Sequence, residues 1–262
     1  MDGDSLIVVM GDQVDKVRIT NLNVVNLDGL QFLTAFTELD ASNNNNLQAI
    51  PFFSDSLIKF TCYDCSQLEI IPDFPSKLDT IAGTSWQISN LPSFPMGLKF
   101  IILHSLQQVS ELPVFPPGLT YLVLRYFHSL LSFPVIPESC EAIFLTNLGD
   151  NCCPNNLPDT LNIPSSAKEF VINDFGAIFP FLPTDKTNLQ RLEIVGTNIS
   201  SMPSLYDFVN MDHLDLSNNA LLKLDSIPFA LQTIQVQGNP LICVENKPPL
   251  VADQLAEFEI CP

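Results

Sequence analysis

Four of the seven cysteines stand in two close pairs, and these pairs are the residues best suited to metal chemistry. Cys62 and Cys65 form a Cys-x-x-Cys pair, and Cys152 and Cys153 are adjacent. A structural zinc site needs four ligands of fitting spacing, and no histidine stands near the second pair. We therefore expect no metal site at either pair.

The other residue types that support catalysis are not arranged for it. His104, His128 and His213 accompany no Gly-x-Ser-x-Gly elbow and no Ser/His/Asp set. The sequence has no phosphate-binding loop or dinucleotide-binding fingerprint. Its carboxylates are scattered rather than gathered into a calcium loop. We expect that the chain is not an enzyme and that it binds no cofactor.

Charge and composition limit the classes of binding partner and the cellular compartments that we expect for this protein. The 262 residues carry a formal net charge of −18, which would repel both a nucleic-acid backbone and an anionic membrane. No stretch approaches the ~18 apolar residues of a membrane helix, so we expect no membrane insertion. The acidic N-terminus lacks the features of a signal peptide. We therefore expect reduced thiols and a cytoplasmic protein, or one delivered by an unconventional secretion route.

A repeat of about 21 residues runs through the chain. Segments 91–111 and 112–132 share the frame xPxxPxxLxxLxLxxLxxLxx. If the first apolar residue of LxxLxL marks each repeat, successive marks lie 20 to 22 residues apart, with one step of 27 after the seventh mark. The eleven marks are Val14, Phe36, Leu57, Leu78, Leu98, Leu119, Cys140, Ala167, Leu189, Met211 and Leu231.

This repeat predicts a short strand followed by an extended return path. The last two apolar positions of LxxLxL lie two residues apart, so they share one face of a strand, and successive strands can stack in parallel at about 4.8 Å. We predict a mostly β, right-handed, curved solenoid with eleven parallel strands on its concave face and an extended, polyproline-like convex side. Proline, which favours extended backbone, follows the last apolar residue of the repeat at Pro51, Pro72, Pro92, Pro113, Pro134, Pro158, Pro183, Pro203 and Pro228.

Each repeat also has an inward position just beyond its strand. Asn44, Asn219 and Asn239 occupy it and can pair with loop backbone, whereas Cys65, Leu106, Phe127, Leu148 and Phe175 replace the asparagine elsewhere. In the fourth repeat Gly83 stands where a core leucine belongs, and Trp86 fills the asparagine position. We interpret this pair as a core exchange, in which the ring takes the volume that the missing side chain leaves.

The repeats define a single domain with two caps. Residues 1–13 form the N-terminal cap, 14–241 the eleven repeats and 242–262 the C-terminal cap. The segment VADQLAEFEI (251–260) is the best amphipathic helix candidate, and we expect it to close the C-terminal end, since an open solenoid exposes its core.

The LPxxPxxLxxL pattern of repeats three to six resembles the short LPX subclass of leucine-rich repeats, found in bacterial effectors of the YopM and IpaH type. This resemblance implies a horseshoe fold that binds other proteins. GNPLIC at 238–243 resembles the entry to common C-terminal caps, which often use cysteine pairs, and only Cys243 and Cys261 remain to form such a bridge.

The resemblance also raises an enzymatic alternative. Effector ligases of this type carry a Cys-x-Asp nucleophile in a separate helical domain, and Cys62-Tyr63-Asp64 matches that motif literally. It falls on a repeat strand with Cys62 inward, where a cysteine behaves as a small hydrophobe. We therefore interpret Cys62, Cys65 and Cys140 as buried, free thiols.

Three functions remain open. The leading one is a scaffold that binds another protein, as a monomer or weak dimer. The first alternative is the substrate-recognition part of an effector ubiquitin ligase whose catalytic domain lies beyond Pro262. The second is a structural or adhesive surface protein, which a leader before Met1 would favour.

The repeat also predicts the binding surface. Residues three, five and seven positions along from each mark, counting the mark as one, should face out of the concave sheet. The end repeats place mostly charged residues there, and the middle repeats place aromatic and apolar ones, which are common interface anchors. The alternative is that the chain's own insertion (148–158) or a dimer contact covers them. The candidate partner-binding residues are Tyr63, Phe100, Ile102, His104, Tyr121, Val123, Arg125, Phe144 and Val171.

Overall fold

The computed structural model describes residues 14–148, 161–174 and 180–262. The predicted N-terminal cap (1–13), the Cys152–Cys153 pair, Pro158 and Phe175 lie outside the described residues. So does nearly all of the segment 148–158 that was considered as a cover for the concave sheet.

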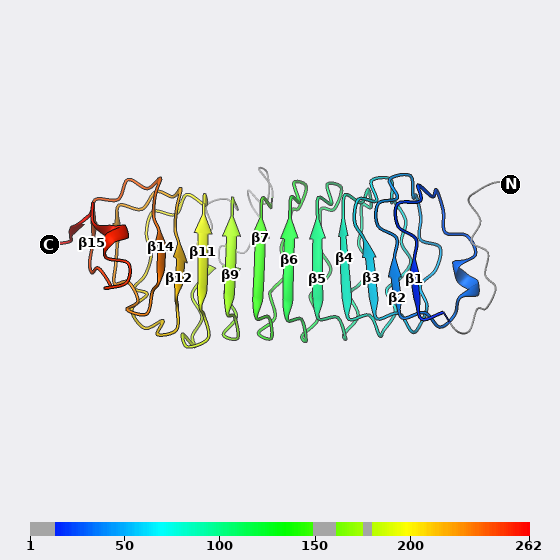
Figure 1. The fold of residues 1–262 in the computed structure, drawn as a ribbon, viewed down its shortest axis with the longest axis horizontal. Helices are drawn as coiled ribbons and strands as arrows, with labels where there is room; N and C mark the ends of the chain where they lie inside the picture. Colours follow the sequence, from blue (N-terminus) through cyan, green and yellow to red (C-terminus); the bar gives the residue numbers. More distant parts are fainter. Residues whose placement is uncertain (1–13, 149–160, 175–179) are drawn as a thin grey trace.

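Eleven strands form one sheet, in which every neighbouring pair is parallel and follows chain order (Figure 1). Residues two beyond successive marks are paired, as Phe100 is with Tyr121 and Tyr121 is with Ala142. The predicted strand register is therefore confirmed. The strands are β1 (Lys16–Arg18), β2 (Glu38–Asp40), β3 (Lys59–Cys62), β4 (Thr80–Thr84), β5 (Phe100–His104), β6 (Tyr121–Arg125), β7 (Ala142–Thr146), β9 (Glu169–Asn173), β11 (Arg191–Val195), β12 (His213–Asp215) and β14 (Thr233–Gln235).

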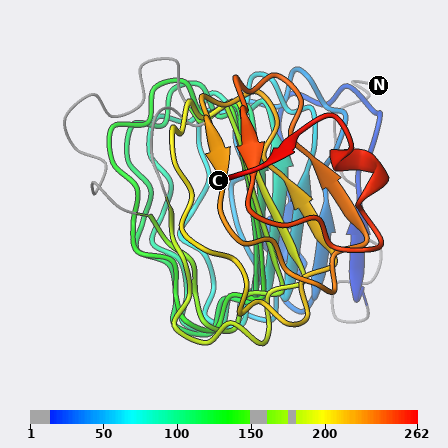
Figure 2. The ribbon, with the colours of Figure 1, turned by 90° about the vertical axis from the view of Figure 1, so that its left-hand side faces the viewer.

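Two small parallel sheets lie outside this ladder. β8 (Leu161–Asn162) pairs with β10 (Pro180–Phe181). β13 (Lys223–Leu224) pairs with β15 (Cys243–Val244), which pairs in turn with β16 (Glu259–Ile260). Seen from the C-terminal end, the strands of the long sheet stack behind one another on one side, and the return segments run along the other (Figure 2).

The core fills the space between the sheet and the return segments. Every mark from Phe36 to Leu231 is at most 1% exposed, because each one points inward and packs between the same position of the repeats before and after it. One continuous hydrophobic core therefore spans all the repeats. The chain is a leucine-rich-repeat solenoid, as the periodicity predicts.

Polar side chains satisfy the backbone where the chain leaves the strands. Asn44 donates from Nδ2 to the carbonyls of Ile19 and Ala41, and its Oδ1 accepts from the backbone N–H groups of Leu22 and Val24. Asn219 has the same arrangement two repeats from the C-terminal end. Buried backbone groups need such partners, so these asparagines tie neighbouring repeats together.

The predicted exchange in the fourth repeat is confirmed. Trp86 is fully buried, and its indole Nε1 donates to the carbonyl of Cys62 over 2.7 Å. A Cβ on residue 83 would lie 2.8 Å from that nitrogen and closer still to two ring carbons. The ring therefore occupies the space in which a leucine side chain would stand.

The return path is extended and turns sharply before each strand. The N–H of Leu98 donates to the carbonyl of Pro95, and Leu119 and Pro116 repeat this contact one turn later. Phenylalanines on this path form a ladder with ring centroids 5.8–6.3 Å apart, a feature the sequence analysis missed. The ladder consists of Phe53, Phe74, Phe94, Phe115 and Phe133.

The predicted C-terminal helix is wrong. Among the described residues the only helical turns are 3₁₀ turns at η2 (Leu30–Phe32) and η3 (Asp253–Leu255), and the second lies within the segment expected to be an α-helix. Val251 and Leu255 are still fully buried, so the segment covers the core as expected. It then continues into β16, because the backbone pairs with β15 rather than with itself.

Two disulfides are present among the described cysteines. Cys243 is bonded to Cys261, the one pair available for a cap bridge. Cys62 is bonded to Cys65, so the prediction that both thiols are free is wrong. Asp64, with φ of 52°, turns the chain back beneath the strand and leaves the two Cα atoms 6.0 Å apart, a separation that suits a disulfide. Cys140 is buried and free, as predicted.

In the part of the chain that the structure describes, no helix has the length and apolar character needed to cross a membrane.

Candidate interaction surface

The outer face of the long sheet carries three rows of side chains, which we call the outer sheet face. They stand at the third, fifth and seventh positions of the repeats and alternate with the inward core residues. The third-position row contains Lys16, Glu38, Lys59, Thr80, Phe100, Tyr121, Ala142, Glu169, Arg191, His213 and Thr233.

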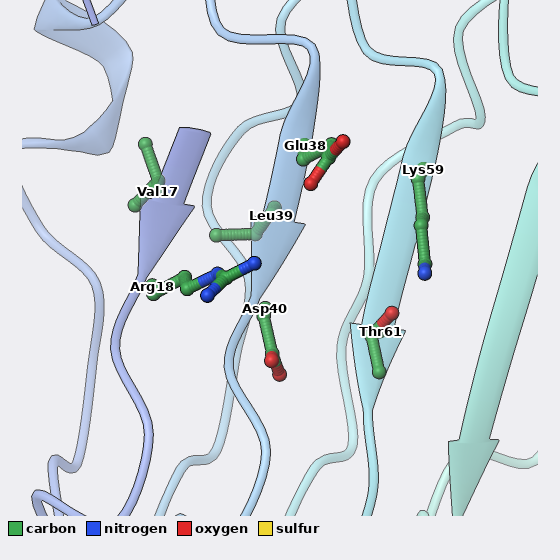
Figure 3. Close-up of a pocket in the computed structure, with 7 residues that line it drawn as sticks. All are labelled: Val17, Arg18, Glu38, Leu39, Asp40, Lys59 and Thr61. Atoms are coloured by element: carbon green, nitrogen blue, oxygen red, sulfur yellow. The ribbon is translucent and has the colours of Figure 1, made fainter. Parts of the chain in front are cut away.

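At the N-terminal end this face is charged, and some of its charges are paired. Lys16 Nζ lies 2.7 Å from Glu38 Oε1. Arg18, Asp40 and Lys59 line a shallow pocket across β1, β2 and β3, with their polar ends spread over its surface (Figure 3). Val17 and Leu39 also line this pocket but are buried, at 5% and 1% exposed, so the accessible groups are mainly charges of both signs.

The C-terminal end is also paired internally. Arg191 Nε donates to Glu193 Oε1 over 2.8 Å, and His213 Nε2 lies 3.0 Å from the same oxygen. His213 Nδ1 makes a further contact of 2.6 Å with Thr233 Oγ1. The side chains of Arg191, Glu193, His213 and Thr233 therefore form one polar network on β11, β12 and β14.

The centre of the face is aromatic. The rings of Phe100 and Tyr121 lie 6.2 Å apart, and those of Tyr121 and Phe144 lie 5.8 Å apart. Phe100 is 38% exposed, and Tyr121, Phe144 and Ile102 are half-buried. Three neighbouring strands, β5 to β7, thus present a continuous apolar surface.

Two predicted contact residues are buried. Val123 and Val171 are each 5% exposed, although their positions belong to the outer face. Each stands beside Phe144 on a neighbouring strand, where larger side chains on both sides can cover a short branched one. They form the floor of the surface and offer a partner little contact area, so their assignment as contact residues needs correction.

His104 and Arg125 face one another across β5 and β6. His104 Nε2 and Arg125 Nε are enclosed by neighbouring atoms and have no hydrogen-bond partner in the described residues. Burial, and then the Arg125 charge, lower the pKa of His104, which favours a neutral imidazole at neutral pH. Arg125 is therefore left as a cation without a carboxylate partner in the described ranges.

Tyr63 comes from the segment that follows β3, three strands from the β6 strand that carries Tyr121. It is half-buried, and its backbone N–H donates to Ser42 Oγ. Burial raises the pKa of its hydroxyl, with smaller contributions from Asp40 and Tyr121. Tyr63 therefore remains protonated at neutral pH and can act as a hydrogen-bond donor at the rim of the surface.

The aromatic centre also lacks acidic groups. The outer positions of β4 to β7 hold no Asp or Glu, although the chain has 29 such residues. The nearest carboxylates on this face belong to Glu38 and Asp40 on one side and to Glu169 and Glu193 on the other. The central strip is thus the part of the face that least opposes a negatively charged group.

Catalytic and metal alternatives find no support in the described ranges. No group of three or more His, Cys, Asp or Glu side chains there is placed to hold a metal ion. Cys62 of the Cys-x-Asp motif is buried and disulfide-bonded, so it offers no thiolate. Burial raises the pKa of the Cys140 thiol to about 12, and a protonated buried thiol is a poor nucleophile.

A conformational feature that was not predicted from the sequence recurs at the end of every strand of the long sheet. The residue seven after each mark has a positive φ, between 48° and 73° in all eleven repeats. Asn, Asp and Gly tolerate this left-handed backbone best, and they fill eight of the positions. The row is Asn21, Asn43, Asp64, Ser85, Ser105, Tyr126, Asn147, Asp174, Gly196, Asn218 and Gly238.

No protein-family model and no curated protein matches the sequence. Solved leucine-rich-repeat structures are similar to it at low identity. YopM from Yersinia enterocolitica is 18% identical with a TM-score of 0.45, covering 91% of this chain and 63% of that chain. YopM from Yersinia pestis is 18% identical with a TM-score of 0.43, covering 89% and 80%. A leucine-rich-repeat protein from Bacteroides ovatus is 13% identical with a TM-score of 0.42, covering 95% and 78%. This chain therefore spans less than two thirds of the first of these proteins.

Proposed function

We propose that this leucine-rich-repeat solenoid is a protein-binding scaffold, and that its partner docks on the outer sheet face over β5 to β7. The centre of the contact is formed by Phe100, Tyr121, Arg125 and Phe144. Tyr63 lies at the rim, and Ile102 and His104 complete the surface between them. No step of this function requires a catalytic group or a cofactor.

The observation that supports this proposal is the aromatic ladder on the central strands. Three rings, with Tyr121 in contact with both Phe100 and Phe144, stand on the outer face, where the fold itself requires no apolar side chain. The strands nearer the two ends of the sheet, β1, β2, β11 and β12, carry charged residues at equivalent positions. Contiguous apolar patches on a soluble surface are uncommon without a use, and Tyr, Phe and Arg are enriched at interfaces.

The two disulfides favour a second candidate, a structural or adhesive surface protein. Disulfides persist in oxidising compartments and are rare in the cytosol. The bonds Cys62–Cys65 and Cys243–Cys261 therefore favour a location outside the cytosol, reached by secretion or by unconventional export. This candidate is compatible with a binding face and differs from the first in where the partner is met.

Affinity capture followed by mass spectrometry, then titration of the purified partner, tests the scaffold proposal. Tyr121→Ala and Phe144→Ala should each weaken binding by about 1–4 kcal/mol. Because both side chains are half-buried, binding is measured at a temperature at which the melting curve of each variant shows it fully folded. Tyr206→Ala and Phe229→Ala are the matched controls.

The two control rings are in contact, with centroids 5.9 Å apart, and both are more than half exposed. They lie on return segments, away from the long sheet. If the controls weaken binding and the Tyr121 and Phe144 variants do not, the docking face lies elsewhere and the proposal is wrong.

A further inference from the structure

Tyr126 is the one bulky residue in the left-handed row at the strand ends. Its φ is 60°, a conformation that is unfavourable for large side chains and persists only when the surrounding structure imposes it. The repeat does impose it, because the N–H of Tyr126 donates to the Thr146 carbonyl over 2.9 Å and its own carbonyl accepts from Gln107. Asparagine would satisfy the same backbone at lower cost, as Asn147 does in the next repeat.

The Tyr126 side chain makes no specific polar or ring contact that would offset this cost. It is 42% exposed, and its hydroxyl and ring make no hydrogen bond or ring contact with the described residues. It directly follows Arg125, at the end of the strand that also carries Tyr121. The strained residue thus stands directly beside Arg125, at the edge of the outer sheet face where the strands end.

Arg125 makes this end of the outer sheet face favourable for a negatively charged group. Its guanidinium is a planar donor suited to bidentate pairing with a carboxylate, and no carboxylate pairs with it in the described ranges. The neighbouring outer positions, His104 and Thr146, carry no negative charge. A carboxylate brought by a partner would therefore meet a cation with no competing anion beside it.

The net charge of −18 does not prevent this contact. The nearest carboxylate on the outer face, Glu169, is on β9, two strands from β6, or about 10 Å at ordinary strand spacing. Exposed charges at that distance are largely screened at physiological ionic strength, where the Debye length is about 8 Å. The local pairing with Arg125 therefore outweighs the distant repulsion.

We propose that the partner segment is a peptide with an acidic side chain next to an aromatic or aliphatic one. The carboxylate pairs with Arg125, the apolar side chain packs on Phe100, Tyr121 and Phe144, and Tyr126 forms the wall of the site at the strand ends. This inference rests on the proposed scaffold function and adds the chemistry that the scaffold recognises.

A selection with a phage-displayed random 12-residue peptide library on the immobilised full chain tests it. Enriched peptides should share an Asp or Glu adjacent to an apolar residue. The Arg125→Gln substitution should lower the affinity for a synthetic copy of a selected peptide at least tenfold. A peptide in which the acidic residue is replaced by its amide should bind the wild-type protein more weakly by the same factor. The same replacement should not further lower the affinity for the Arg125→Gln variant.

Arg18→Gln is the matched control, because Arg18 is an exposed arginine on the same face at β1. It should leave peptide affinity unchanged. Tyr126→Asn should raise the melting temperature, by relieving the backbone, and lower peptide affinity several-fold. A structural role for Tyr126 would produce the opposite change in melting temperature.

The outcomes separate the two proposals. If peptide affinity falls in the Tyr121 and Phe144 variants but not in Arg125→Gln, the acidic-peptide inference is wrong and the scaffold proposal stands. If peptide affinity is unchanged in the Tyr121, Phe144 and Arg125 variants, both proposals are wrong. A selection that yields no peptide dependent on Arg125 also overturns the inference.

Discussion

Gly83→Ala should destabilise the solenoid far more than an added methyl group normally does. The new Cβ would overlap the Trp86 ring, lying 2.8 Å from Nε1 and closer to two ring carbons. The ring cannot simply move away, because it is fully buried and its Nε1 donates to the Cys62 carbonyl. Crowding of a packed core costs about 1–3 kcal/mol, and a buried donor left without its partner costs about 1–3 kcal/mol more.

The assay is urea unfolding followed by circular dichroism, with a predicted loss of about 2–6 kcal/mol in the free energy of unfolding. Gly118→Ala is the control, since the nearest atom that a Cβ there would meet in the described part of the chain is the Met96 carbonyl oxygen, at 4.0 Å; it should change stability by less than about 0.5 kcal/mol.

Combining Gly83→Leu with Trp86→Leu recreates the Leu103 and Leu106 arrangement of the next repeat. The double variant should be more stable than the sum of the single changes by about 1–3 kcal/mol. If Gly83→Ala unfolds with the wild-type midpoint, or if the two changes prove additive, the exchange of volume between these residues is refuted.

Three other measurements probe separate parts of the structure. Protein unfolded in urea without reductant and treated with iodoacetamide should show no alkylation of Cys62 or Cys65, and a mass gain at both should appear after reduction; labelling of either in the unfolded protein before reduction would show that the bond is absent. Gly196→Ala should lower stability by about 1–3 kcal/mol, because φ is +64° and Asp174 Oδ1 crowds the new Cβ; an unchanged unfolding midpoint would contradict this. The NMR titration midpoint of His104 should lie below 6.5 and rise in Arg125→Gln. Because its folded pKa is lowered, the unfolded state binds the proton more tightly, so this group's contribution to stability falls as pH drops through about 6.5 toward the folded pKa; a midpoint at or above 6.5 would show that the site is not desolvated as described.

Periodicity was sufficient to predict the fold and the strand register. A parallel stack aligns equivalent positions, so once the marks were known, the pairing of Phe100 with Tyr121 followed. The Gly83–Trp86 exchange was also predictable, since both changes fall on inward positions of one repeat. These features depend on whether a side chain points into the core or away from it, and the repeat pattern specifies that orientation.

Contacts within one turn were harder to predict. Cys62 and Cys65 were correctly placed inward, but their proximity depends on the left-handed residue between them, Asp64. That conformation could have been recognised from the recurrence of Asn, Asp and Gly seven residues after the marks. The same row would have singled out Tyr126 as its exception.

Exposure on the outer face was predicted only in part. Alternation placed Val123 and Val171 outward, yet both are buried, because burial on a sheet face depends on the size of neighbouring side chains. The C-terminal segment failed for a related reason. Its amphipathic pattern encodes a buried face, and Val251 and Leu255 are buried, but strand pairing with Cys243–Val244 replaced the helix.

The central claim is that a partner covers the outer sheet face over β5 to β7, and hydroxyl-radical footprinting by mass spectrometry tests it most directly. In the complex with the captured partner, oxidation of Phe100, Tyr121 and Phe144 should fall several-fold relative to the free protein. Oxidation of Tyr206 and Phe229, on the return segments, should stay the same. Unchanged oxidation of the three central rings in a saturated complex would contradict the account.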